Sequence, residues 1–448
     1  MLPNLSAENC GYRGEGNAGL VIYLKKEEKV LRLIKQDVES QTSINQEDQL
    51  QRLQNQISMV KNVMKPLLGE NLVNCPAIVF LHSEDIKMLN NLFSTKRPDF
   101  RKHKHVKEED SYALVLPDYC TLPPDLKVLP STGPVITVEI KPKQGYLSKN
   151  EFLPTTLPSN SFLKCRFCMT QHYKLKKNMI TSKSAYCPTD LFSGCPTRMH
   201  HALKMLIETP QNNLRIFKNQ ELIYSEENRR DPEETLQDFF GKDEISCTDA
   251  LCKLIVKILL KTFTQTVDER VCLFQKENLQ SCTNVYPSCT QDGICHKLPL
   301  GCVLYRILCI QMLDQLHIQN LHSHFLKIME SDARPSDHDD CLPIFSIPPH
   351  FGKEERMPEE TDVQYSLRKV WEFLVALTAR DCSIMLVLKN YSDRYSSNHS
   401  QNLVENDDGK LYLFSIAIAD LDAKPVSKVE RHFKDMPFLI QSCLSQSV

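Results

Sequence analysis

Apolar residues in the first 140 positions fall into short runs separated by polar turns. Runs of this length, rich in aliphatic and aromatic residues, predict β-strands. The predicted strands are residues 21–24, 30–34, 78–81, 112–116 and 135–140. A longer periodic stretch at 46–68 predicts a helix among them. We therefore expect an early sheet with a glycine-rich turn, Gly14–Gly19, near its start.

The middle of the chain changes to helical spacing. The clearest helical segments are residues 200–208, 248–263 and 300–318. Stretches at 264–298 and 330–360 lack this periodicity and predict irregular structure.

The last part of the chain returns to strands. A predicted helix at 364–379 leads into an apolar strand at 383–388. Asp408-Gly409 is typical of a tight turn and precedes a second apolar run at 411–419. We therefore expect a late hairpin.

Composition describes an ordinary globular chain. Of 448 residues, 41% are hydrophobic and 25% are charged, and the net charge is −2. Since no overall field attracts nucleic acid, any anion site must be a local cluster of cations. The 18 cysteines are too dilute for a disulfide scaffold.

Membrane and export signals are not evident in this sequence. The N-terminus lacks the basic and apolar regions of a signal peptide. The most apolar segment, 251–261, carries a lysine at every fourth position, which predicts an amphipathic helix rather than a membrane span. We expect a soluble monomer of the cytoplasm or nucleus.

The glycine-rich segment is a candidate phosphate-binding turn. Glycines let backbone N–H groups approach phosphate oxygens without a Cβ clash. The motif precedes a strand rather than a helix, which favours a kinase-style phosphate cover over a dinucleotide fold. The alternative is a plain turn between strands.

Basic residues cluster at two places. Glu139-Ile-Lys-Pro-Lys143 ends a strand, and Lys141 and Lys143 at i and i+2 face the same side, so both ammonium groups could meet one phosphate. The alternative is a solvated strand end. The denser run from Arg97 to Lys107 is followed directly by acids and on its own predicts only surface.

Cysteines and a histidine follow the spacing of a structural zinc site. Cys165-x-x-Cys168, His172 one helical turn later, and Cys187 are the candidate ligands. His200 could replace His172, and buried free thiols are the alternative. Cys289, Cys295 and His296 form a looser rival set.

Carboxylates stand at the ends of the two late strands. Asp381 precedes one strand, and Asp420 and Asp422 follow the next. Across a hairpin these acids could meet in one cleft. ATP chemistry needs one carboxylate to orient the attacking hydroxyl and another to hold Mg²⁺. Solvation of a hairpin end is the alternative.

In order along the chain, these segments resemble the inositol-pentakisphosphate 2-kinase family of the animal type. The resembling motifs are Tyr12-Arg-Gly-Glu-Gly16, Glu139-Ile-Lys-Pro-Lys143-x-Gly145, Tyr186-Cys-Pro-x-Asp-Leu-Phe-Ser-Gly194, Pro210-Gln-Asn-Asn213, Gln311-Met-Leu-Asp314, Asp381-Cys-Ser-Ile-Met385 and Asp420-Leu-Asp-x-Lys-Pro425. The resemblance implies a two-lobed, kinase-like α/β (α+β) fold. Its lobes would be residues 1–130 and 131–448, the second holding a helical and zinc-bearing segment at about 150–330 and a catalytic hairpin at about 364–434.

The resemblance also implies residue roles. Asp381 would accept the hydroxyl proton, Lys141 would contact the transferring phosphate, and Asp420, with Asp422, would hold Mg²⁺. The nucleotide site would contain Gly14, Glu15, Gly16, Asn17, Arg32, Asp118, Glu139 and Asp420. The inositol phosphates would meet Arg101, Lys143, Lys174, Asn212, Asn213, Lys424 and Lys428, although family members can carry Arg at the last position and Tyr near His432.

The expected activity is ATP-dependent phosphorylation of the 2-hydroxyl of inositol 1,3,4,5,6-pentakisphosphate, giving inositol hexakisphosphate (phytate). The expected cofactors are ATP, Mg²⁺ and a structural Zn²⁺. A non-catalytic inositol-polyphosphate sensor with the same fold is the first alternative. A zinc-bearing nucleic-acid-binding protein is the second, and the lack of basic excess disfavours it.

Overall fold

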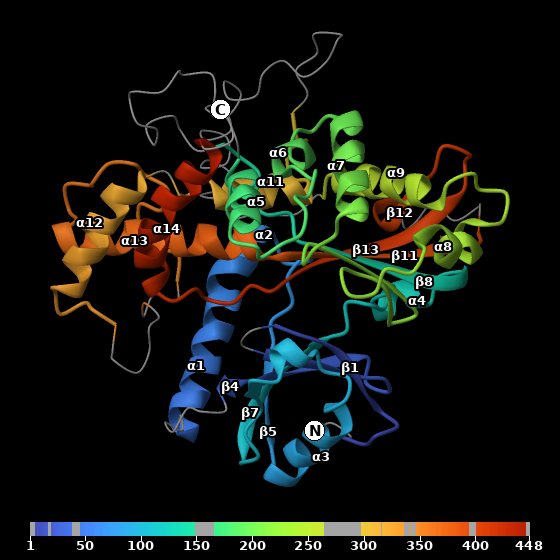
Figure 1. Cartoon of the computed structure of the whole chain (residues 1–448), viewed down its shortest axis with the longest axis horizontal. Helices are drawn as coiled ribbons and strands as arrows, with labels where there is room; N and C mark the ends of the chain where they lie inside the picture. Colours follow the sequence, from blue (N-terminus) through green and yellow to red (C-terminus); the bar gives the residue numbers. More distant parts are fainter. Residues whose placement is uncertain are drawn as a thin grey trace.

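The chain forms a small and a large lobe (Figure 1). The computed structural model describes residues 5–16, 19–37, 45–147, 165–263, 297–314, 316–335, 342, 346–393 and 400–444. The predicted irregular segment 264–298, with the rival Cys289, Cys295 and His296 set, lies almost wholly outside the described residues.

The small lobe is built on a five-stranded antiparallel sheet with strand order β1-β2-β3-β7-β5. These strands are β1 Cys10–Glu15, β2 Gly19–Leu24, β3 Lys29–Ile34, β5 Ala77–Leu81 and β7 Ser111–Pro117. Helix α3 (Ser83–Phe93) buries Ile86, Leu89 and Phe93 against the sheet. The strands predicted at 21–24, 30–34, 78–81 and 112–116 are confirmed.

A short two-stranded sheet fixes the basic run of the small lobe. It pairs β4 (Gln36–Asp37) with β6 (Lys104–His105). Just before β6, a 3₁₀ turn at Asp99–Arg101 carries Arg101, which was predicted to bind the substrate.

One helical segment joins the lobes, as Figure 1 shows. It contains α1 (Gln46–Met59), a π-helical turn (Val60–Met64) and α2 (Lys65–Leu68), so the predicted helix at 46–68 is confirmed. Near its start, Gln49 accepts a hydrogen bond from the backbone N–H of Tyr112 in the small lobe. Its last turns are buried in the core of the large lobe.

The large lobe contains a six-stranded antiparallel sheet with order β10-β9-β8-β11-β13-β12. Its strands are β8 Ser131–Ile140, β9 Leu214–Lys218, β10 Glu221–Tyr224, β11 Ser383–Tyr391, β12 Leu403–Glu405 and β13 Leu411–Ala419. The predicted late strands are confirmed. The strand at 135–140, which we grouped with the early sheet, instead lies at the centre of this one. Alternation predicts a strand but not its partners, and Ile136, Val138 and Ile140 are buried in the core of the large lobe.

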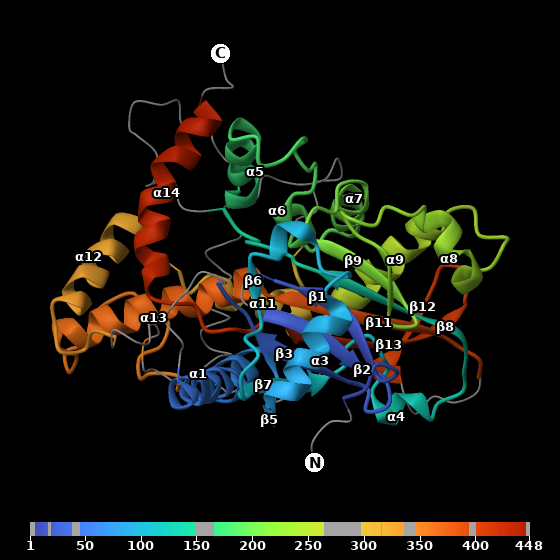
Figure 2. The ribbon, with the colours of Figure 1, turned by 60° about the horizontal axis from the view of Figure 1, so that its bottom comes forward.

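Helices cover this sheet and extend beyond it (Figure 2). They are α4 Pro124–Lys127, α5 Arg166–Lys176, α6 Pro188–Leu191, α7 Pro196–Glu208, α8 Pro232–Phe240, α9 Cys247–Leu259, α11 Val303–Gln311, α12 Ile318–Met329, α13 Asp362–Asp381 and α14 Ser427–Leu444. The helices predicted at 200–208, 248–263 and 364–379 are confirmed within a few residues. The stretch 300–318 is divided, because α11 ends at Gln311 and α12 begins at Ile318. In the described part of the chain, no helix combines the length and apolarity needed to cross a bilayer.

Candidate active site

Antiparallel pairing brings the two acidic segments to one edge of the large sheet. Ser383 at the start of β11 pairs with Ala419 at the end of β13. Asp381 ends α13 just before this pair, and Asp420 follows it directly. On the other side of β11, β8 runs antiparallel and ends at the same edge, close to Glu139. The structure therefore brings together acids that are hundreds of residues apart in sequence.

Asp381 lies between two lysines. Lys143 Nζ is 3.2 Å from Asp381 Oδ1, and Lys424 Nζ is 2.8 Å from Oδ2. Burial alone would raise the pKa of this carboxyl, but the two ammonium groups outweigh burial and hold the pKa well below its usual range. The Asp381 side chain remains 53% exposed, so an ionised carboxylate is accessible to a ligand.

Lys141 lies between two further carboxylates. Its Nζ is 2.5 Å from Asp420 Oδ2 and 3.9 Å from Glu139 Oε1. The Ser383 hydroxyl contacts both acids, at 2.9 Å from Glu139 Oε1 and 3.0 Å from Asp420 Oδ2. Burial opposes ionisation of Asp420, but Lys141 and Arg32 lower its pKa to about 2. Carboxylate oxygens are the ligand type that Mg²⁺ prefers.

Asp422 faces a different partner. Both of its oxygens accept hydrogen bonds from the Arg32 guanidinium, and Oδ1 also accepts one from the Gln56 amide. These contacts join β3 of the small lobe to the segment after β13. Arg32, predicted for the nucleotide site, and Asp422, predicted for Mg²⁺, therefore form a link between the lobes in this structure. Asp420 rather than Asp422 lies beside Lys141.

The glycine-rich turn presents backbone rather than side chains. Gly14 and Glu15 end β1, the Gly16 N–H donates to the Gly19 carbonyl at 2.9 Å, and Asn17 lies outside the described residues. A Cβ placed at Gly14 or Gly16 would have open space around it, which leaves room for a phosphate.

The Glu15 carboxylate points into the small lobe. It accepts hydrogen bonds from Lys35 at 2.5 Å and from Arg97 at 2.9 Å, and it is 1% exposed. Burial opposes its ionisation, but these two cations lower its pKa. A carboxylate would repel phosphate, so this side chain supports the turn from behind.

Asp118 lies buried at the hinge between the lobes. Its Oδ2 is 2.5 Å from Arg13 Nη2, and its Oδ1 accepts the Cys120 N–H at 2.9 Å. Arg13 also donates to the Gln220 carbonyl of the large lobe at 2.7 Å. The side chain of Asp118 therefore stabilises the hinge rather than opening onto a ligand.

A cavity of about 1300 Å³ lies in front of Asp381. Its walls come from both lobes. All the residues expected to meet inositol phosphates line it, namely Arg101, Lys143, Lys174, Asn212, Asn213, Lys424 and Lys428. Gly14, Glu15 and Asp381 line it as well, so the glycine-rich turn and Asp381 open onto the same space.

Further cations line the cavity that the sequence did not identify. They include Arg166 and Arg215, and the imidazole of His432 lies with them. Arg166 and Lys174 lie eight residues apart on α5, about 80° around the helix axis, and both line the cavity. Arg215 follows Asn213 by two residues at the start of β9 and donates to Glu139 Oε2 at 3.4 Å.

The crowding of cations is visible in their proton affinities. Burial and the charges of Arg166, Arg380 and Lys428 lower the pKa of His432 to about 2. Burial and Arg380 lower the pKa of Arg166 to about 10. Neighbouring cations lower one another's pKa, and a polyanion placed among them would be attracted.

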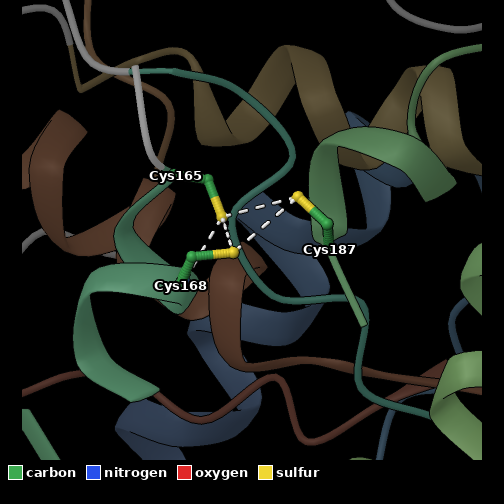
Figure 3. Close-up of side chains that lie close together, drawn as sticks. All are labelled: Cys165, Cys168 and Cys187. Carbon is green, nitrogen blue, oxygen red and sulfur yellow. Dashed lines mark hydrogen bonds between the residues drawn. The ribbon is translucent and has the colours of Figure 1, made fainter. Parts of the chain in front are cut away.

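A cluster of three thiols lies at the N-terminal ends of α5 and α6 (Figure 3). Cys165 Sγ is 3.3 Å from Cys168 Sγ and 3.8 Å from Cys187 Sγ, and the last two sulfurs are 3.9 Å apart. A tetrahedral zinc ion with Zn–S bonds of about 2.3 Å requires sulfurs about 3.8 Å apart, so the three thiols fit this metal.

Neither predicted histidine joins the cluster in the described structure. Of the groups searched there, only the three cysteines have ligand atoms within 4.8 Å of one another. His172 is buried on α5, one turn after Cys168. His200 Nε2 instead lies 2.9 Å from Asp249 Oδ1, so His200 is not a ligand candidate in this structure.

Comparison with known proteins is consistent over nearly the whole chain. A sequence model of the family "Inositol-pentakisphosphate 2-kinase" matches residues 12–435. The inositol-pentakisphosphate 2-kinase of Danio rerio is 30% identical, over 97% of this chain and 92% of its own length. That of Arabidopsis thaliana is 27% identical, over 97% of this chain and 93% of its own. The chain belongs to the inositol-pentakisphosphate 2-kinase family.

Proposed function

We propose that this chain transfers the γ-phosphate of ATP to the 2-hydroxyl of inositol 1,3,4,5,6-pentakisphosphate, giving inositol hexakisphosphate. The observation that carries the proposal is the single cavity in which the expected substrate residues surround Asp381. Each phosphate carries about −1.5 to −2 charges, so a pentakisphosphate needs many cations in one place. The relatives' names, inositol-pentakisphosphate 2-kinase, agree with this chemistry.

Asp381 is the proposed proton acceptor. It is ionised, partly exposed and fixed on each side by Lys143 and Lys424. A carboxylate of low pKa is a weak base, but it can orient the hydroxyl and take its proton late, when the new O–P bond is forming. Most of the rate acceleration then comes from positioning and from charge stabilisation by the lysines.

Lys141 is proposed to contact the transferring phosphate. Its ammonium lies beside Asp420 and within reach of Glu139, at the edge where β8 and β13 end. These two carboxylates would hold Mg²⁺, which neutralises charge on the nucleotide phosphates when bound. The backbone of Gly14–Gly16 would cover those phosphates from the small lobe.

The nucleobase is proposed to lie at the hinge. There, Cys120, Phe217 and Met385 form a small buried apolar cluster, with Tyr119 and Leu222 packed against it. Tyr119 and Leu222 are only partly buried, and apolar side chains of this kind can pack against an aromatic base. Asp118 and Arg32 would shape the nucleotide site through the hinge and lobe contacts that their side chains make.

We further propose that Cys165, Cys168 and Cys187 hold a structural Zn²⁺. The sulfur spacing supports this, and the metal would tie the start of α5 to the start of α6. His172, one turn after Cys168 on α5, is the proposed fourth ligand. A location in the cytoplasm or nucleus stays a prediction.

The test is an assay of the purified protein with labelled ATP against a panel of inositol phosphates. The proposal predicts Mg²⁺-dependent label on the pentakisphosphate and a hexakisphosphate product. Binding of inositol phosphate without consumption of ATP would instead identify a non-catalytic sensor.

A further inference from the structure

Lys143 adopts a backbone conformation that a lysine rarely takes. Its φ is +61°, in the left-handed region that favours glycine. Such a conformation persists only where neighbouring groups hold it, and it is found mostly at functional sites. At this position the chain has just left β8 and turns so that the ammonium reaches Asp381. Some contact must therefore fix this turn.

Gln311 makes that contact. It is the last residue of α11 and is 0% exposed. Its Nε2 donates to the carbonyl of Lys143 at 2.8 Å and to that of Ala379 at 3.2 Å. Its Oε1 accepts the N–H of Gly145 at 2.8 Å. Both amide donors and the acceptor are used, on backbone groups of two separate segments.

The joined segments are the two that carry the lysine and its acid. Lys143–Gly145 is one, and Ala379 stands two residues before Asp381. A second contact runs in parallel, because the buried Arg380 guanidinium contacts Asp314 Oδ2 at 2.5 Å as well as the Tyr146 hydroxyl. The Gln311–Asp314 motif thus contacts both the segment that carries Lys143 and the segment that carries Asp381.

We propose that Gln311 is a positioning residue for the phosphoryl transfer. It holds Lys143 in its left-handed conformation and sets the relative placement of Lys143 and Asp381. Without it, Lys143 would relax to an ordinary φ, and its ammonium would leave both the carboxylate and the cavity. The proposal rests on the proposed function, since it gives that reaction a further residue that does not touch the substrate.

The first test replaces Gln311 with Met, which has similar volume but no amide. A misplacement of about 1 Å at a reacting group can lower the rate about 100-fold, so kcat of Q311M should fall by roughly this factor while KM for ATP stays near the wild-type value. Q49M is the matched control, because Gln49 is a buried glutamine whose amide bonds Ser111 and Tyr112 away from the cavity. It should lower thermal stability and leave kcat within about twofold.

The second test is the pH profile of Q311E. A buried Glu has a raised pKa, and when protonated it can accept from Gly145 and donate to Lys143 as the amide does. When ionised it places an acceptor against the Lys143 carbonyl. The kcat of Q311E relative to the wild type should therefore rise as the pH falls from about 8 to about 6. The kcat is expressed per folded enzyme, because a merely structural role would change the folded fraction with pH and not this rate.

Clear outcomes would overturn the proposal. They are a Q311M kcat within twofold of the wild type, or equal losses in Q311M and Q311E at every pH. If the wild type itself did not turn over, the proposed function would fail instead. Calorimetry with inositol hexakisphosphate would then test the role of Gln311 separately. If Gln311 places Lys143 in the cavity, Q311M should bind this ligand more weakly than the wild type, and Q49M should not. Equal binding by Q311M and the wild type would refute the proposal.

Discussion

Replacing Glu15 with Gln would leave two cations without a carboxylate inside the small lobe. The side chains of Glu15, Lys35 and Arg97 are 1%, 0% and 9% exposed, so water cannot replace the lost charge. Removing one member of a buried ion pair costs about 3–5 kcal/mol, because the partner stays buried and unpaired. Against a typical total of about 5–15 kcal/mol, this is a large loss.

The substitution should also reach the cavity. Arg97 Nη2 donates to the carbonyls of Arg101 at 3.1 Å and Lys104 at 2.5 Å, so Glu15 indirectly fixes the loop that carries Arg101. When Arg97 loses its carboxylate, this loop should become less ordered. We expect weaker binding of inositol hexakisphosphate to E15Q, measured by calorimetry under conditions in which both proteins are folded.

Stability is measured by equilibrium unfolding in urea. Since the pKa of Glu15 is lowered on folding, its contribution is present above the unfolded pKa of about 4.3 and is lost as the pH falls through the folded value. The wild type and E15Q should therefore converge in strongly acidic buffer. D99N is the control, because the Asp99–Lys102 pair lies in the same loop but is exposed, and it should change nothing measurable. An E15Q protein as stable as the wild type at neutral pH would refute the reasoning.

Two further changes test separate parts of the account. Lys424→Met removes one of the cations that lower the pKa of Asp381, so the acid limb of the pH–rate profile should move to higher pH. If the limb does not move, it does not report the ionisation of Asp381. Cys187→Ser should reduce bound zinc from about one equivalent to less than half, measured by metal analysis of protein never exposed to chelator. The control is Cys195→Ser, which changes a buried cysteine outside the cluster and should retain the zinc. Full zinc occupancy in C187S would remove Cys187 from the ligand set.

Much of the site could be predicted because it depends on local patterns. Strand ends can be located by alternation, and acids or lysines at strand ends tend to meet where antiparallel strands share an edge. The register Ser383–Ala419 then places Asp381 and Asp420 together, as the hairpin suggested. The family motifs supplied the cavity residues of the small lobe, which charge alone marked only as surface.

Tertiary partners could not be predicted in this way. Glu15, Asp118 and Asp422 all fall in or near motif segments, yet each carboxylate pairs with an arginine or lysine. Such pairs depend on which side chain the folded chain brings close, and spacing in the sequence does not encode it. The alternation of apolar and polar residues in β8 would suit either sheet, so it could not predict which sheet the strand joins. The role of Gln311 depends on a backbone angle at Lys143, which the sequence does not show.

The central claim is that remote cations surround one catalytic carboxylate, and the most direct test is turnover and binding by Asp381→Asn. Loss of the proton acceptor should lower kcat by about 10²–10⁴-fold. Affinity for inositol pentakisphosphate should be kept or increased, since one negative charge leaves a cavity lined by Lys143, Lys424 and other cations. Turnover at the wild-type rate would contradict the account, and so would a loss of substrate binding.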